Sequence, residues 1–145
     1  MNDNASTPTP SPAMQSLDRL VGTWELTGDS TGTVTYEWME GGFFLLQHVA
    51  MHLFGSDVKA LEVIGHLQPF GQPPTPEVRS RAYDTRGNTL DYVYEMDGDT
   101  LTIWGGEPGS SSSYYRGTFV DEDTNVGQWT FPGGGYTSTM HRISR

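Results

Sequence analysis

An alternation of apolar and polar residues with a period of two runs through nearly all of the chain after Gly22. The segment 33–40 shows it most clearly. There Val34, Tyr36 and Trp38 share one face, while Thr and Glu occupy the other. Because successive side chains of a β-strand point to opposite faces, the pattern predicts strands that are buried on one side.

Turn residues divide this pattern into about ten short segments. The 18 Gly and 9 Pro supply tight turns, and a 12% share of aromatic residues favours strands over helices. The predicted strands are 23–28, 33–40, 43–52, 58–67, 77–83, 89–96, 100–104, 113–120, 125–131 and 136–143. Only the proline-rich segment 69–76 is a long irregular connection. We therefore expect an all-β, up-and-down antiparallel β-barrel of about ten strands, which closes a meander without leaving edges.

The residues before Gly22 follow other patterns. Residues 1–12 hold no apolar side chain after Met1, which predicts a disordered tail. From residue 13, apolar residues recur at spacings of three and four, which predicts a short N-terminal helix that leans on the barrel. With 145 residues in total, 13–145 is expected to form one domain.

Composition excludes several classes of protein. The chain has no Cys, which removes disulfides and thiolate metal sites. It carries 18 Asp and Glu against 8 Lys and Arg, a net charge of −10, so no nucleic-acid partner is expected. No apolar stretch approaches the roughly 20 residues of a spanning helix, and no signal peptide is visible. We expect a cytoplasmic protein without a membrane partner.

A resemblance to lipocalin-like barrels, the calycins, begins at Gly22-Thr23-Trp24, which matches their G-x-W signature. In this signature Gly allows a tight entry into the barrel and Trp plugs its closed end. Further segments resemble a bacterial lipocalin-like family of unknown function, and the matches are 17–24, 37–47, 62–65, 83–87 and 117–119. They span most of residues 15–145. Nitrobindin, a ten-stranded haem barrel, is similar more distantly, and that resemblance implies His141 on the last strand as the iron ligand.

Three residues are candidates for catalysis. His66 ends its predicted strand just before the proline-rich loop, where barrel mouths usually lie, and Glu62 shares its face. Glu62 and His66 are four residues apart and do not touch within the strand, but a carboxylate from a neighbouring strand could orient His66 as a general base near neutral pH. Tyr92 is the third, because it can present a phenol to a cavity while its ring packs on the wall. The alternative is that all three are ordinary wall residues.

The face of 43–52 that carries the even-numbered residues is predicted to point inward and to line the cavity. The candidate ligand-binding residues are Tyr36, Trp38, Phe44, Leu46, His48, Ala50, Tyr94 and Trp104. His48 and His52 share a face but lie roughly 13 Å apart along the strand, so no metal site is expected from them. The alternative for the aromatic residues is a filled barrel core. Because 43–51 is apolar on both faces, its outer side is expected to be covered, and one explanation is the second subunit of a homodimer.

These observations leave three functions open. The first is the binding of a small, mainly apolar or aromatic molecule in the barrel cavity. The second is a cofactor-free isomerase or cyclase that acts on an unsaturated small molecule in the same cavity. The third is a nitrobindin-like haem protein with His141 as ligand. The first two need no cofactor.

Overall fold

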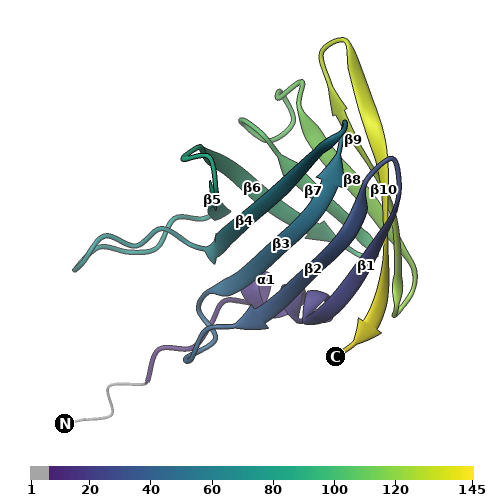
Figure 1. Ribbon diagram of the computed structural model, residues 1–145. Helices are drawn as coiled ribbons and strands as arrows, with labels where there is room; N and C mark the ends of the chain where they lie inside the picture. The colour runs from purple at the N-terminus through teal and green to yellow at the C-terminus, as the bar shows by residue number, and fades with distance from the viewer. Residues whose placement is uncertain (1–6) are drawn as a thin grey trace, which may run out of the picture.

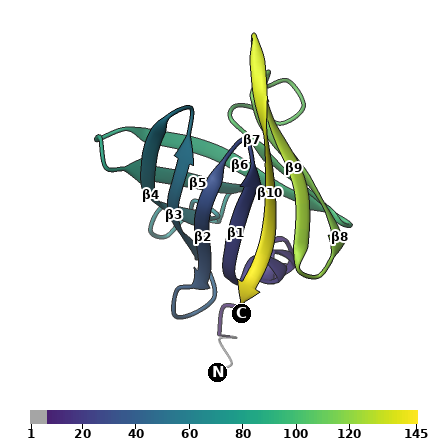
Figure 2. The ribbon, with the colours of Figure 1, turned by 45° about the vertical axis from the view of Figure 1, so that its right-hand side comes forward.

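The computed structural model describes residues 7–145 and contains a closed antiparallel barrel of ten strands (Figure 1). The strands are β1 (Gly22–Gly28), β2 (Thr31–Trp38), β3 (Leu45–Leu53), β4 (Ser56–Gly65), β5 (Val78–Asp84), β6 (Thr89–Asp97), β7 (Thr100–Trp104), β8 (Tyr114–Asp121), β9 (Thr124–Phe131) and β10 (Gly134–Ser144). Each pairs with its neighbours in sequence, and β10 returns to pair with β1 (Figure 2). The predicted up-and-down barrel is confirmed.

A short helical segment closes one end of the barrel, as Figure 1 shows. It consists of α1 (Pro12–Gln15) and a 3₁₀ turn, η1 (Ser16–Leu20). The Ser11 side chain accepts a hydrogen bond from the Met14 amide, and Pro12 occupies the first turn, where its missing N–H costs nothing. The helix therefore starts before residue 13. Residues 1–6 of the predicted tail lie outside the described residues.

Trp24 plugs this closed end, as the G-x-W resemblance implies. Its side chain is fully buried, and its Nε1 donates a hydrogen bond to the Leu20 carbonyl at 2.8 Å. Phe119 meets the indole edge-on with ring centroids 6.2 Å apart, and the guanidinium of Arg142 lies 4.2 Å from the ring centroid. The helix adds Leu17 to the same cluster, so the end is solidly packed.

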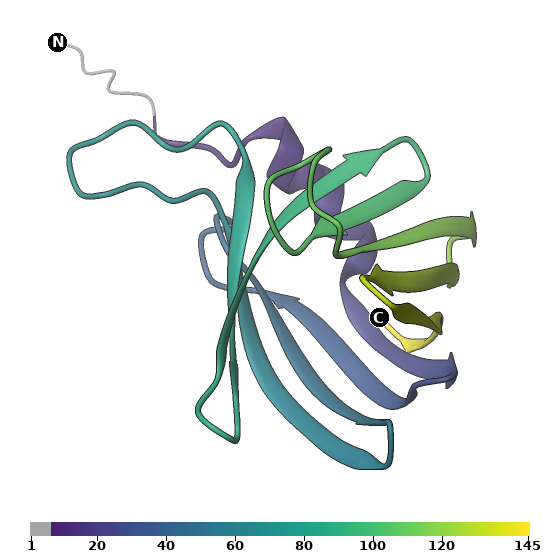
Figure 3. The same ribbon diagram turned by 90° about the horizontal axis from the view of Figure 1, so that it is seen from above.

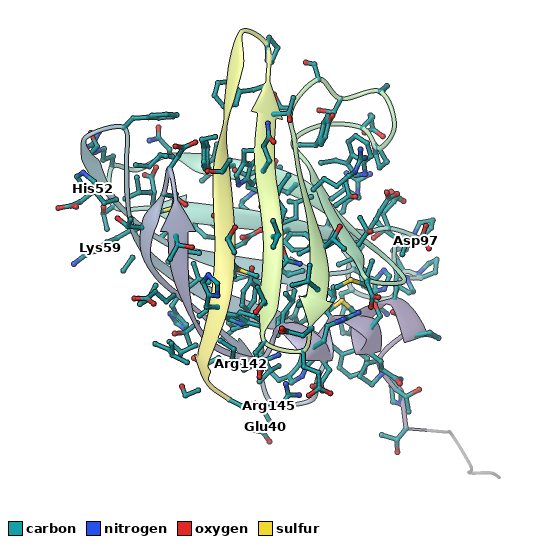
Figure 4. All side chains as sticks on the ribbon, turned by 90° about the vertical axis from the view of Figure 1, so that its right-hand side faces the viewer. Glu40, His52, Lys59, Asp97, Arg142 and Arg145 are labelled. Atoms are coloured by element: carbon teal, nitrogen blue, oxygen red, sulfur yellow. The ribbon has the colours of Figure 1, made fainter. Side chains whose placement is uncertain are left out.

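Arg142 ties the last strand to this closed end, where Figure 4 labels it near the C-terminus of β10. Its guanidinium donates hydrogen bonds to the carbonyls of Arg19, Val21 and Glu122 and pairs with Asp123 at 2.8 Å. Helix-end carbonyls need such partners, and a buried guanidinium with five donors can serve several at once.

The hairpins β1–β2, β3–β4, β5–β6, β7–β8 and β9–β10 turn at the opposite end of the barrel, seen from above in Figure 3. Because β1 starts beside the helix, every second connection returns to the closed end. The connection 66–77 between β4 and β5 is one of these. The prediction that this loop marks the mouth is therefore wrong.

The predicted inner face of β3 is also wrong, by one residue. In the register of β2 and β3, Val34 pairs with Val49 and Tyr36 with Gln47, so the odd-numbered residues of β3 face inward with Tyr36. The even-numbered residues face outward, and Ala50 is exposed. A strand that is apolar on both faces carries no alternation to set its facing, which explains the error.

Within residues 7–145, no helix has the length and apolar character needed to cross a membrane.

Candidate functional site

A cavity of about 170 Å³ occupies the barrel interior above the packed closed end. Its walls are mainly apolar and aromatic, and side chains from strands on all sides contribute. The lining includes Leu26, Val34, Tyr36, Gln47, Val49, Met51, Val58, Ala60, Glu62, Ala82, Leu90, Tyr92, Tyr94, Leu101, Ile103, Tyr115, Trp129, Tyr136, Ser138 and Met140.

Small inward side chains create part of this space. Ala60 and Ala82 occupy inward positions of β4 and β5, where neighbouring strands carry Val, Met or Tyr. In register, Ala82 lies opposite Glu62. A larger residue at either alanine would fill the space beside the carboxyl group, so these two positions keep it open to the cavity.

Glu62 is the charged residue of the lining and is only 5% exposed. Its Oε2 accepts hydrogen bonds from the Ser80 hydroxyl at 2.6 Å and from the Tyr94 hydroxyl at 2.8 Å. Burial raises the pKa of Glu62 above its usual value, and the two hydroxyls oppose this rise. Burial, and then the nearby Glu62 charge, raise the pKa of Tyr94.

The second oxygen of Glu62, Oε1, accepts no hydrogen bond from the described residues. Across residues 7–145, the one fully enclosed side-chain polar atom without a partner is Nδ2 of Asn125. Oε1 is therefore not enclosed by protein and opens onto the cavity. No basic side chain lines the cavity within the described chain, so this oxygen has no charged partner there.

A second polar pair lies next to Glu62. Gln47 is the register partner of Glu62 on β3, and its Nε2 donates to the Tyr36 hydroxyl at 2.8 Å. Burial raises the pKa of Tyr36, and the charge of Glu62 adds to the rise. Adjacent strands thus gather Tyr36, Gln47 and Glu62 into one polar corner of an otherwise apolar cavity.

An aromatic wall is built around Trp129. Its ring centroid lies 5.7 Å from that of Tyr92, 5.6 Å from that of Tyr115 and 6.5 Å from that of Tyr136. Burial, with the Glu62 charge, raises the pKa of Tyr92 to about 12, so its phenol stays a neutral hydrogen-bonding group. At the tip of the β3–β4 hairpin, exposed Phe54 meets Tyr136 edge-on at 5.5 Å and extends this wall outward.

Two glycines give Tyr115 its place in the wall. Gly117 and Gly127 are register partners on β8 and β9, and a Cβ at either would overlap the Tyr115 side chain. The phenol lies over this bare backbone and donates to Asn125 Oδ1 at 2.7 Å. Absent side chains, rather than a special backbone conformation, explain glycine at these positions.

Four of the predicted site residues meet in the cavity: Glu62, Tyr92, Tyr36 and Tyr94. His48 and His52 do not, because they lie on the outer face of β3. His48 pairs with Glu37 at 2.9 Å and His52 with Asp57 at 3.0 Å, and Figure 4 shows His52 at the edge of the barrel.

The remaining candidates from the predicted inner face also lie outside the cavity. Leu46 and Ala50 are outward residues of β3, and Phe44 precedes that strand and packs against Gly65. Trp38 donates to Asp18 Oδ1 at 2.8 Å beside the closed end. Trp104 faces outward from β7 and donates to Glu95 at 2.7 Å.

His66 lies at the closed end and does not line the cavity. Its Nδ1 lies 2.7 Å from the Thr75 carbonyl, to which it donates, and its Nε2 lies 2.7 Å from the Ser11 hydroxyl. Neither ring nitrogen bonds to a carboxylate of the described residues, so this geometry does not supply the cross-strand carboxylate that was predicted to orient His66. The histidine instead holds the start of the helix against the β4–β5 loop.

His141 does not fit the haem site that the nitrobindin resemblance implies. It alternates with inward Met140 on β10 and faces outward, where its Nε2 lies 3.2 Å from the Thr27 hydroxyl of β1. A ligand to iron inside the barrel would have to come from the lining, and the lining within the described chain holds no histidine. Residues 7–145 also hold no group of three or more His, Cys, Asp or Glu that could bind a metal ion.

Sequence reasoning missed Gln47, Ser80, Tyr115 and Tyr136. The missing information was strand register. Once Tyr36 is taken as inward, pairing β2 with β3 places Gln47 beside it, and pairing β4 with β5 brings Ser80 close to Glu62. A polar residue within the apolar run 43–51 was the available signal, because Gln inside such a strand calls for a buried partner.

No known protein-family model matches the chain, and a search of curated proteins found no significant match. The closed ten-strand barrel is consistent with a lipocalin-like fold, and it is compatible with the binding of a small molecule.

Proposed function

We propose that this protein binds one small, mainly apolar or aromatic molecule inside the barrel, with the polar end of the molecule against Glu62. The observation that carries the proposal is the partly unpaired carboxyl group of Glu62 in a cavity walled by aromatic rings. Binding sites for small molecules typically combine apolar walls with a few polar groups that fix orientation.

The size of the cavity limits the size of the ligand. Its volume of about 170 Å³ is close to that of an engineered apolar cavity of ~150 Å³ that binds benzene. Sites for drug-sized molecules are larger, roughly 300–1,000 Å³. A ligand with a single ring and a short polar substituent fits this range.

A matched pair of variants tests the site. Ala60→Trp places an indole in the cavity, whereas Ala50→Trp places it on the outer face of the neighbouring strand. Titration of an environment-sensitive apolar dye that is small enough for this cavity, with a single aromatic ring, should show one site per chain in the wild type and in Ala50→Trp, and none in Ala60→Trp. Equal dye binding by both variants would place the site elsewhere, and no binding by the wild type would overturn the proposal.

A cofactor-free isomerase or cyclase is the second candidate, with Glu62 taking the role predicted for His66. One observation favours it. Burial raises the pKa of the Glu62 carboxyl above its usual value, which favours a role in proton transfer, and Oε1 faces the cavity. If the protein turns over an unsaturated substrate, Glu62→Gln should lower kcat by about 10²–10⁴-fold with the affinity retained. Unchanged turnover in Glu62→Gln would remove this candidate.

We also propose that the chain belongs with the lipocalin-like barrels, supported by the position of Trp24 at the closed end. A cytoplasmic location and a homodimer remain predictions. The outer face of β3, with half-buried Leu46, is the surface that the homodimer would cover. Native mass spectrometry of protein purified from its own host would report both the subunit number and any retained ligand.

A further inference from the structure

The charge distribution around Glu62 points to a class of ligand, an inference that rests on the proposed function. Strands β2, β3, β5 and β6 all present groups to this carboxyl. They are Tyr36, Gln47, Ser80, Tyr92 and Tyr94, and all are neutral or, when ionised, negative. The lining offers no cation within the described residues.

A carboxyl group in this position lacks one interaction. Buried charges are normally paired, because removing them from water without a partner is costly. Oε2 has two donors, whereas Oε1 faces the cavity with none from the described residues. A ligand that brings a positive charge and N–H donors to Oε1 would supply what the protein leaves out.

The aromatic wall favours the same charge. Cations are attracted to the faces of Trp and Tyr rings, with Trp the strongest. Trp129 contributes an indole to the cavity, and Tyr36, Tyr92, Tyr115 and Tyr136 contribute phenol rings. The net charge of −10 also raises the local concentration of cations around the protein and repels anions.

We propose that the cavity binds a small organic amine, with its ammonium group on Glu62 Oε1 and its apolar or aromatic body among the rings. A neutral molecule of the same shape would leave Oε1 without a charged partner. An anionic one would face both the carboxylate and the negative faces of the rings. The ligand is therefore selected by charge as well as by size.

Three compounds that each carry one ring and one short polar substituent test this selection: benzylamine, benzyl alcohol and benzoate. Calorimetric titration of the wild-type protein near pH 7.5 should give an affinity for benzylamine about tenfold or more above that for benzyl alcohol, with benzoate weakest. Equal affinities for the amine and the alcohol, or a preference for benzoate, would overturn the inference.

Two isosteric variants locate the source of the selectivity. Glu62→Gln and Glu37→Gln each remove one negative charge, but Glu37 lies on the outer face, paired with His48. The preference for the amine should vanish in Glu62→Gln and persist in Glu37→Gln, and Glu37→Gln should also leave the affinity for benzyl alcohol unchanged. A preference that survives Glu62→Gln would contradict the assignment of Oε1.

A pH series needs no variant and covers the case in which Glu62→Gln does not fold. As the pH rises above 4.5, the usual pKa of this carboxyl, and through the raised pKa of Glu62, the affinity of the wild type for benzylamine should rise as Glu62 ionises, whereas its affinity for benzyl alcohol should not. A flat profile for the amine overturns the inference.

If benzyl alcohol binds without any preference for the amine, the inference fails but the proposed binding function stands. If none of the compounds and no apolar dye binds, the proposed function itself fails.

Discussion

The two halves of the barrel interior differ in packing, since one is filled with side chains and the other is hollow. At the helix end, Trp24, Leu17 and Leu20 leave no space, and their side chains are almost completely buried. Toward the hairpin end, Ala60 and Ala82 take positions that larger side chains could fill, and a cavity remains. Both halves are enclosed by the same ten strands with the same alternation, so the difference lies in the helical segment that closes one end and in the size and polarity of the side chains.

This contrast assigns stability to one end of the barrel and binding to the other. Close-packed side chains gain dispersion contacts on every side, whereas the lining of a cavity lacks partner atoms on one side. We expect the packed end to supply most of the free energy of folding and the hollow end to tolerate change at lower cost.

The largest test of this division compares two tryptophans. Trp24→Ala should lower the free energy of unfolding by about 3–5 kcal/mol, since it empties the packed end and removes the hydrogen bond to Leu20. Trp129→Ala should cost less by more than about 1 kcal/mol, because Trp129 already borders open space. Urea unfolding monitored by far-ultraviolet circular dichroism measures both, and equal losses would break the division.

Arg142 should contribute nearly as much as Trp24 to the stability of the packed end. Arg142→Met removes donors from several carbonyls near the helix and should cost about 2–3 kcal/mol. Its control is Arg145→Met. Arg145 is exposed and pairs with Asp18 at 3.0 Å, a kind of pair worth about 0–1 kcal/mol (Figure 4). Similar melting temperatures for the two variants would show that the buried guanidinium does not hold this end together.

At the hollow end, Glu62→Gln should stabilise the protein, in contrast to both changes above. The pKa of Glu62 is raised in the folded state, so the folded protein binds its proton more tightly than the unfolded chain. The stability that this group contributes is present below its usual pKa and is lost as pH rises through the raised value. Glu62→Gln should therefore show a flatter stability profile above about pH 4.5 and a higher melting temperature at neutral pH than the wild type. A variant less stable than the wild type at neutral pH would indicate that the carboxylate is well compensated in the fold.

The smallest effect is expected where the helix begins. Ser11→Ala removes the cap of α1 and the contact with His66, and should cost about 1 kcal/mol. Ser112→Ala, in an exposed part of the β7–β8 loop, is the control and should leave the melting temperature unchanged. Should both serines prove neutral, the N-terminal segment would contribute no measurable stability to the packed end.

The barrel could be predicted from the sequence because alternation and turn residues are local signals. The position of Trp24 followed from the G-x-W resemblance. The cavity could be predicted only in part, because which face of a strand points inward depends on its partners. Tyr36 on clearly alternating β2 was placed correctly, while Ala50 on β3, apolar on both faces, was not.

The wrong assignment of His66 to the mouth of the barrel has a different cause, which is the direction of the strand that it follows. The proline-rich loop looks like a mouth when it is considered alone, but the direction of a meander alternates at each strand. Counting strands from Trp24, which marks the closed end, would have assigned this loop to the helix end. No local feature of His66 carries that information.

The bare backbone under Tyr115 has a consequence for how the sequence of this barrel can change. Gly117 and Gly127 leave the space that the phenol fills, so a side chain at either requires a smaller residue at 115, and one at Gly117 also displaces the side-chain amide of Asn125. The three positions should therefore vary together across related sequences, as one inherited unit, while neighbouring lining positions drift separately. A lineage that exchanges this tyrosine for a small residue but keeps both glycines would gain room beside Trp129, and with it space for larger ligands.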